Sequence, residues 1–246
     1  MEIHSRFASF AFVFASFVFP HSARLNPSVS PFSLQDNMNH PIDFVYFDLG
    51  NIIVSFDPKV AIANLVGRFG LDGEHARTCL YESGYQEEYE KGRLTCDQFA
   101  EAVRKQIGIH PSQMSNRDLL DASCDMFTPI ESMAETVAKV AKKGTRYGVL
   151  SNTCVSHWDW IANRTWQVSQ IAWPHRIVSY EVGAMKPDPR IYAAAETLAG
   201  VEPTRILFLD DKQENIDAAV QRGWNAVQCF GGESAEQVLK AFGVID

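Results

Sequence analysis

VYFDLGNIIV, residues 45–54, is the stretch that decides how this chain begins to fold. Apolar residues run to Phe47, stop at the carboxylate of Asp48, and resume after a Leu-Gly-Asn turn. A short apolar run without polar alternation is typical of a parallel strand that is buried on both faces. We therefore expect a buried strand over residues 43–48 that ends in an acidic side chain.

Four further segments repeat this pattern farther along the chain. They are YGVLS (147–151), RIVSY (176–180), RILFLD (205–210) and NAVQCF (225–230). Helical patterns alternate with them, for example over residues 131–144 and 188–200, and both of these end at a glycine, a common helix stop. This alternation predicts an α/β fold with a doubly wound parallel sheet.

Residues 58–127, between the first and second of these strands, read as helices without a good strand. The helical patterns cover residues 58–70, 73–81, 95–108 and 116–127. Thr95, followed three residues later by Gln98, forms a capping box for the third of them. The predicted organisation is a core over residues 41–57 and 128–246, with a helical cap inserted over residues 58–127.

Residues 1–40 are expected to be a leader or a disordered extension rather than part of the fold. The apolar run over residues 7–20 has the length of a signal-peptide core and is too short to span a bilayer. A Ser-, Pro- and Asn-rich stretch follows it and reads as disordered. Two alternatives stay open: translation begins at Met38 and the protein is cytoplasmic, or residues 1–23 are a signal peptide and it is exported.

Charge and cysteine content argue against a nucleic-acid-binding protein and against a disulfide-linked one. The net charge is −8, and no lysine or arginine run exists beyond Lys142-Lys143, which argues against a nucleic-acid partner. We also expect no stable membrane association, and the oligomeric state stays open. The five cysteines are an odd number, widely spaced and without a C-x-x-C pair, so reduced thiols in a cytoplasmic protein are the simplest interpretation.

Chemically active side chains follow the predicted strands, at the edge where an open α/β sheet binds ligands. They are Asp48, Ser151, Asp210 and Asp211, with Lys186 in the loop after the third strand. Each alone has an ordinary interpretation, because an aspartate after a strand often caps a helix and a loop lysine is often solvated. Three carboxylates at one edge repel one another unless a cation holds them, so together they indicate a site.

The residues around these positions carry a resemblance. FDLGN (47–51), SNT (151–153), KPDPRIY (186–192) and FLDDKQENI (208–216) resemble the four ordered motifs of the haloacid dehalogenase superfamily. FDLGN, SNTxxxH and KPxxRIY are similar to the sugar-phosphate phosphatases typified by α-D-glucose-1-phosphate phosphatase. The resemblance implies a Mg²⁺-dependent phosphatase with a helical cap, acting on small phosphate esters, foremost sugar phosphates.

The same resemblance implies a role for each motif residue. Asp48 would attack phosphorus and form an aspartyl-phosphate, which splits one hard step into two. Ser151 and the Asn152 backbone N–H would bind the phosphoryl group, and Lys186 would neutralise its charge. The implied Mg²⁺ ligands are the Asp48 carboxylate, the Gly50 carbonyl and the Asp211 carboxylate, with Asp210 supporting the bound water.

Gly50 departs from the usual phosphatase pattern of the superfamily, in which a second aspartate protonates the leaving group. The similar sugar phosphatases carry the same glycine. His157, the histidine of SNTxxxH, is a candidate acid/base or substrate-binding residue, and a packed histidine is the alternative. Further candidates are Asp57, Glu87, Glu90 and Arg93. Four tryptophans at 158, 160, 166 and 173 suggest packing or a sugar-stacking platform.

Two other functions remain open from the sequence. The missing aspartate at position 50 is compatible with a catalytically silent binding domain. It is also compatible with a 2-haloacid dehalogenase, because a leaving halide needs no proton. That chemistry has no use for a divalent metal, however, and Asp210-Asp211 favour one, so sensitivity to a chelator separates the alternatives.

Overall fold

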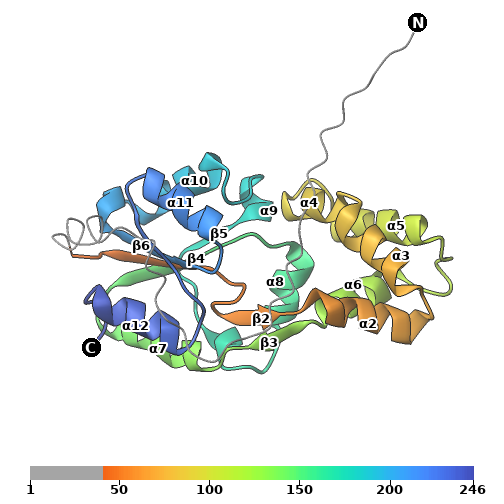
Figure 1. Ribbon diagram of the computed structural model, residues 1–246, viewed down its shortest axis with the longest axis horizontal. Helices are drawn as coiled ribbons and strands as arrows, with labels where there is room; N and C mark the ends of the chain where they lie inside the picture. Colours follow the sequence, from red (N-terminus) through yellow and green to blue (C-terminus); the bar gives the residue numbers. More distant parts are fainter. Residues whose placement is uncertain (1–40) are drawn as a thin grey trace, which may run out of the picture. The chain divides into compact units, whose positions relative to one another are not determined.

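The computed structural model describes residues 41–246, and the expectations for residues 1–40 lie outside this range. Its centre is a parallel five-stranded sheet with the strand order β5-β4-β1-β6-β7 (Figure 1). The strands are β1 (Phe44–Phe47), β4 (Arg146–Ser151), β5 (Arg176–Val178), β6 (Ile206–Asp210) and β7 (Asn225–Gln228). The predicted doubly wound parallel sheet is confirmed.

Helices cover both faces of this sheet (Figure 1). Alternate residues of β1 serve the two faces: Phe44 and Tyr46 pack toward α10 (Pro189–Ala199) and α11 (Gln213–Gln221). Val45 and Phe47 belong to the core on the other face, with α7 (Ser132–Lys142) and α12 (Glu233–Ala241). All four β1 residues have no exposed surface, which explains why the run lacks polar alternation.

Two of the predicted strands end two residues earlier than expected. The segment over residues 176–180 is a strand only to Val178, because Ser179–Val182 form the short helix α9. The segment over residues 225–230 ends its strand at Gln228. The apolar pattern continues past these ends, whereas pairing with the neighbouring strand stops, and pairing defines the strand.

The expectation of no strand between residues 58 and 127 needs a correction at its borders. β2 (Val54–Phe56) and β3 (Phe127–Pro129) form a separate antiparallel pair, with Phe56 opposite Phe127. Three residues are too few to show a strand period, and the pairing joins segments far apart in sequence. This ribbon carries the chain out of the core and back (Figure 1).

Between β2 and β3 the chain is helical. The helices are α2 (Pro58–Phe69), α3 (Gly73–Arg77), α4 (Tyr85–Glu90), α5 (Cys96–Ile107) and α6 (Asn116–Cys124). A π-helical turn, Thr78–Glu82, extends α3, and the predicted Thr95–Gln98 capping box is present. These helices share an apolar cluster that includes Leu65, Phe99 and Leu119. The short helix α4 was not anticipated, since six residues carry little periodicity.

One core residue, Cys154, is buried within the apolar cluster of the helical insertion. Cys154 directly precedes α8 (Val155–Ala162). The helical insertion therefore packs against the core at the start of α8. The five cysteines are unpaired thiols. Over residues 41–246 the structure contains no helix with the length and apolar character needed to cross a membrane.

Candidate active site

The strand order brings three sequence motifs to one edge. β1 lies between β4 and β6 and runs parallel to both, so their carboxyl ends adjoin. Asp48 follows β1, Ser151 ends β4 and Asp210 ends β6. Carboxylate oxygens of Asp48, Asp210 and Asp211 all lie within 4.8 Å of one another. The residues predicted at this edge are therefore brought together.

Lys186 supplies the positive charge inside this cluster. Its Nζ lies 2.9 Å from the Asp48 carboxylate and 2.5 Å from that of Asp210, and it donates to the Leu150 carbonyl at 3.0 Å. Burial opposes its charge, but the two carboxylates outweigh burial and raise the pKa of Lys186. With only 4% of its surface exposed, the ammonium is a fixed cation of the site.

Asn152 holds the loop that carries Lys186. Its side-chain oxygen accepts from the Lys186 backbone N–H at 2.7 Å, and its amide donates to the Lys186 carbonyl at 2.9 Å. This reciprocal pair ties the end of β4 to the Lys186 loop. The Asn152 side chain thus positions the cation, while its backbone N–H is the group predicted to face a phosphoryl oxygen.

Asp210 and Asp211 differ in how many hydrogen bonds their carboxylate oxygens accept from the protein. Asp210 is fully buried and accepts from Lys186, from the Lys212 backbone N–H and from the Asn215 amide. Asp211 is half-buried and receives a side-chain hydrogen bond from Asn51 at 2.9 Å. Because Asp210 is already satisfied by protein donors, Asp211 is the better candidate for direct metal contact.

Negative charge is in excess at this edge. Burial raises the pKa of Asp48 to about 7 despite Lys186, and the neighbouring carboxylates add to the rise. Burial and Asp210 also raise the pKa of Asp211. A bound divalent cation reverses such shifts, since it favours the ionised carboxylates. Oxygen-only donors of this kind suit a hard cation such as Mg²⁺.

Gly50, whose backbone carbonyl is a predicted metal ligand, lies in the turn directly after Asp48. Within residues 41–246 no hydrogen bond is donated to the Gly50 carbonyl. In the surrounding turn the Asn51 N–H donates to the Val54 carbonyl, and the Val54 N–H donates to the Leu49 carbonyl. A Cβ at position 50 would come within 2.9 Å of the Phe56 ring. Phe56 therefore occupies part of the space that a side chain at position 50 would need.

His157 lies on α8 with its ring edge-on to Phe127, at 5.2 Å between ring centroids. Burial lowers the pKa of His157 to about 4. At neutral pH the imidazole is therefore uncharged and has no acidic proton to give to a leaving group.

Burial of this neutral imidazole should make stability depend on pH. Unfolded His157 protonates near pH 6.5 and folded His157 only near pH 4, so the unfolded state binds more protons between these values. The His157 contribution to the free energy of unfolding should fall as pH drops through this window, by about 2 kcal/mol between pH 8 and pH 5. Asp48, whose pKa is raised, contributes with the opposite sign. The quantity to compare is therefore the change in the free energy of urea unfolding between the two pH values, which should be less unfavourable at pH 5 in His157→Gln than in wild type. The exposed His110→Gln variant should keep the wild-type slope; equal slopes in all three proteins would contradict the prediction.

The tryptophans pack rather than line the carboxylate cluster. Trp158, Trp166 and Trp173 lie against the core, and Trp160 stacks under the Arg164 guanidinium at 3.6 Å. Trp158 and Trp173 border a small apolar hollow beside Leu49.

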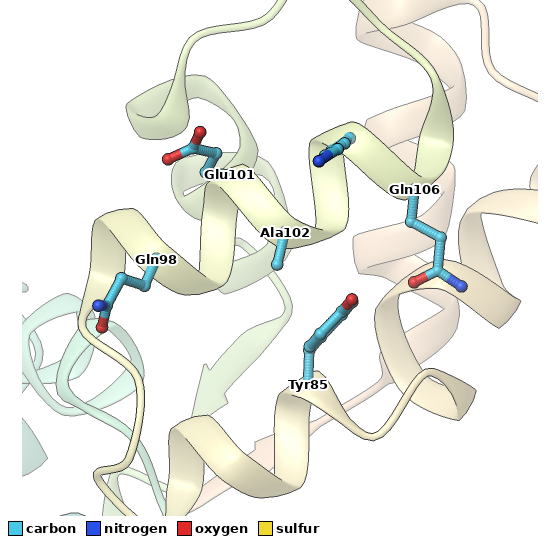
Figure 2. Close-up of a pocket in the computed structure, with 6 residues that line it drawn as sticks. Tyr85, Gln98, Glu101, Ala102 and Gln106 are labelled. Atoms are coloured by element: carbon cyan, nitrogen blue, oxygen red, sulfur yellow. The ribbon is translucent and has the colours of Figure 1, made fainter.

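A larger hollow lies on the helical insertion, between α4 and α5 (Figure 2). Its lining residues are Tyr85, Gln98, Glu101, Ala102, Lys105 and Gln106. None of these residues belongs to the four motifs, and they bring no group of carboxylates together. The chemistry-bearing residues therefore lie elsewhere, at the sheet edge.

Three residues that support the site were not singled out from the sequence. Asn51 adopts a left-handed φ of +55° and bonds Asp211, and Asn215 bonds both oxygens of Asp210. Ser179 joins β5 to the end of β4, because its hydroxyl bonds both the N–H and the carbonyl of Thr153. Asn51 and Asn215 lie inside the motifs FDLGN and FLDDKQENI. Their position as polar residues near a predicted ligand was the signal that could have identified them.

The sequence of this chain is similar to those of known proteins. The model of the haloacid dehalogenase-like hydrolases matches residues 42–223. D-ribitol-5-phosphate phosphatase of Bacteroides thetaiotaomicron is 26% identical over 203 residues, which cover 79% of this chain and 95% of the relative. The mouse acyl-CoA dehydrogenase family member 10 is 24% identical over 80% of this chain, but the match spans only 19% of that longer protein.

Solved structures agree on the fold. A haloacid dehalogenase family enzyme from Bacteroides thetaiotaomicron, in complex with magnesium and inorganic phosphate, superimposes with a TM-score of 0.67. It is 23% identical and covers 80% of this chain and 98% of its own. L-2-haloacid dehalogenase from Xanthobacter autotrophicus gives a TM-score of 0.55 at 20% identity, over 76% of this chain and 77% of its own. By the match over most of its length, the chain belongs to the haloacid dehalogenase-like hydrolases.

Proposed function

We propose that this hydrolase is a Mg²⁺-dependent phosphatase of small phosphate esters, with sugar and sugar-alcohol phosphates as the substrate class. The observation that carries the proposal is the contact of Asp48 with Lys186 beside the Asp211 carboxylate, at one strand edge. The likeness to D-ribitol-5-phosphate phosphatase supports the substrate class.

Asp48 is the proposed nucleophile. Its carboxylate stands at the end of a fully buried strand, and the Leu49 N–H donates to it at 2.7 Å, so its position is fixed before substrate arrives. In the first step an Asp48 oxygen bonds to phosphorus and the ester oxygen leaves as an alcohol after taking up a proton. In the second step water attacks the same phosphorus, and phosphate and the free Asp48 carboxylate result.

Charge is the main barrier, because an anion attacks an anion. Lys186 would balance Asp48 and the phosphoryl oxygens, and Ser151 with the Asn152 N–H would donate hydrogen bonds to the group in transfer. Asp48, Asp211 and the Gly50 carbonyl would hold Mg²⁺, with Asp210 orienting its surroundings. The ion would supply further positive charge against the phosphoryl oxygens.

The helical insertion is proposed to act as the cap that selects the substrate. It sits on the start of α8, only a few residues beyond Ser151. Its contacts with the core therefore lie close to the phosphate-binding loop. Substrate choice would then depend on side chains of the insertion that face the core, rather than on the sheet.

Purified protein should hydrolyse sugar phosphates and sugar-alcohol phosphates, ribitol 5-phosphate among them, with release of inorganic phosphate. EDTA should abolish the activity and added Mg²⁺ restore it. The same preparations are offered 2-chloropropionate with halide release as the readout. Halide release that EDTA leaves intact, without phosphate release, would replace the proposal by a dehalogenase; inactivity on both substrate classes would argue for a silent domain.

Gly50→Asp is expected to keep phosphatase activity, because the proposed metal contact at position 50 uses only the backbone carbonyl. The new side chain must displace the Phe56 ring, whose surface is 37% exposed and which can therefore turn outward. Any gain should be largest on esters with poor leaving groups, such as ribitol 5-phosphate, and small on p-nitrophenyl phosphate. Adding Phe56→Ala should raise the activity of the variant further. Loss of activity in both variants, with Mg²⁺ saturating, would contradict this prediction.

A further inference from the structure

The carboxyl end of α4 and the turn after it contact the core at the starts of α8 and α9, which follow β4 and β5. The Tyr89 hydroxyl accepts a hydrogen bond from the Ser156 backbone N–H at 3.0 Å. Gly92, with a φ of +68°, approaches the core so closely that a Cβ would lie 2.1 Å from the Tyr180 carbonyl oxygen. Glu90 lies between these two contacts in the chain. It is therefore held where the helical insertion meets the core.

Burial and neighbouring groups act on the charge of the partly buried Glu90 carboxylate. Burial raises the pKa of Glu90, while the Gln86 amide, which donates to it at 2.8 Å, and the Lys212 ammonium oppose the rise. Lys212 directly follows Asp211 in the loop after β6. Burial and then Glu90 raise the pKa of the Cys154 thiol, which directly precedes α8. Glu90 thus lies near two of the motif loops.

Glu90 has no charged partner within hydrogen-bond or ion-pair distance among residues 41–246. The other candidates for proton transfer are occupied. Asp57 accepts from a backbone N–H at the start of α2, which is a capping contact. Glu87 and Arg93 are more than half exposed, and each is paired with an oppositely charged neighbour on the insertion. His157 is neutral and packed against Phe127.

We propose that Glu90 is the general acid and base of this site, in place of the carboxylate that Gly50 lacks. The assignment rests on the proposed phosphatase function. In the first step the protonated Glu90 gives its proton to the ester oxygen as the bond from that oxygen to phosphorus breaks. In the second step the Glu90 carboxylate takes a proton from the attacking water, and the bond between phosphorus and the Asp48 oxygen breaks.

Glu90→Gln tests the assignment, because glutamine keeps the size of the side chain and removes the transferable proton. The matched control is Glu88→Gln on the same helix, whose carboxylate is exposed and paired with Arg93. The two substrates are ribitol 5-phosphate, whose alkoxide needs a proton, and p-nitrophenyl phosphate, whose phenolate leaves without one. The value of kcat/KM reports only the steps through release of the first product.

Glu90→Gln should lower kcat/KM on ribitol 5-phosphate by about 100-fold and leave kcat/KM on p-nitrophenyl phosphate nearly unchanged. Its kcat on p-nitrophenyl phosphate should fall, with a burst of p-nitrophenolate, because the second step lacks its base. Glu88→Gln should match wild type on both. Equal losses on both substrates, or no loss on either, would overturn the assignment of Glu90 and leave the phosphatase function standing. Inactivity of the wild-type protein toward both esters would overturn the proposed function, and the assignment with it.

Discussion

Asp48→Asn should abolish phosphatase activity, lowering kcat by at least about 10⁴-fold, the scale seen when a nucleophile is removed. A carboxamide is a poor nucleophile and a weaker ligand for a hard cation than a carboxylate. The loss should appear on every ester, including p-nitrophenyl phosphate, because every ester requires attack by Asp48 whatever its leaving group. Steady-state rates on ribitol 5-phosphate and p-nitrophenyl phosphate measure it.

The fold of this variant should survive. Asp48 is one of three mutually repelling carboxylates, and Lys186 keeps its contact with Asp210 when Asp48 becomes neutral. Thermal unfolding of Asp48→Asn should therefore occur close to the wild-type temperature. Asp43→Asn, just before the opposite end of the same strand, is the control and should keep full activity. Wild-type rates in Asp48→Asn would end the aspartyl-phosphate proposal.

Lys186→Met should cost both stability and activity. It leaves Asp48 and Asp210 buried without their cation, and removal of one partner from a buried ion pair typically costs about 3–5 kcal/mol. The kcat/KM on phosphate esters should fall by about 10²–10³-fold, the range seen when one stabilising donor is removed from a transition state. Denaturant unfolding and steady-state kinetics measure the two losses separately.

Two further variants separate the contributions of Lys186. Lys143→Met breaks an exposed pair with Asp246 and should change stability by less than about 1 kcal/mol. Adding Asp210→Asn to Lys186→Met removes one of the stranded charges. It should recover part of the stability and none of the activity. A Lys186→Met protein as stable as Lys143→Met would show that the buried carboxylates do not depend on this cation.

Local sequence patterns determined the fold class and most of the residues at the sheet edge. Asp48, Asp210 and Asp211 follow apolar runs that could only be buried parallel strands, and such strands end at a common edge. The helical character of residues 58–127 was equally local, since the Thr95 capping box and the apolar spacing lie within single helices. These features depend on residues a few positions apart, which a sequence displays directly.

Only the tertiary structure decided which groups meet across the chain. The pairing of β2 with β3 and the amide bonds of Asn152 to the Lys186 loop join segments distant in sequence. The ring of Phe56 beside Gly50 and the burial of Glu90 near Lys212 likewise arise from packing. The sequence offered Glu90 only as one of four further candidates, with nothing to separate it from Asp57, Glu87 and Arg93. The burial of Glu90 depends on the docking of α4 on the core, which no short stretch of sequence encodes.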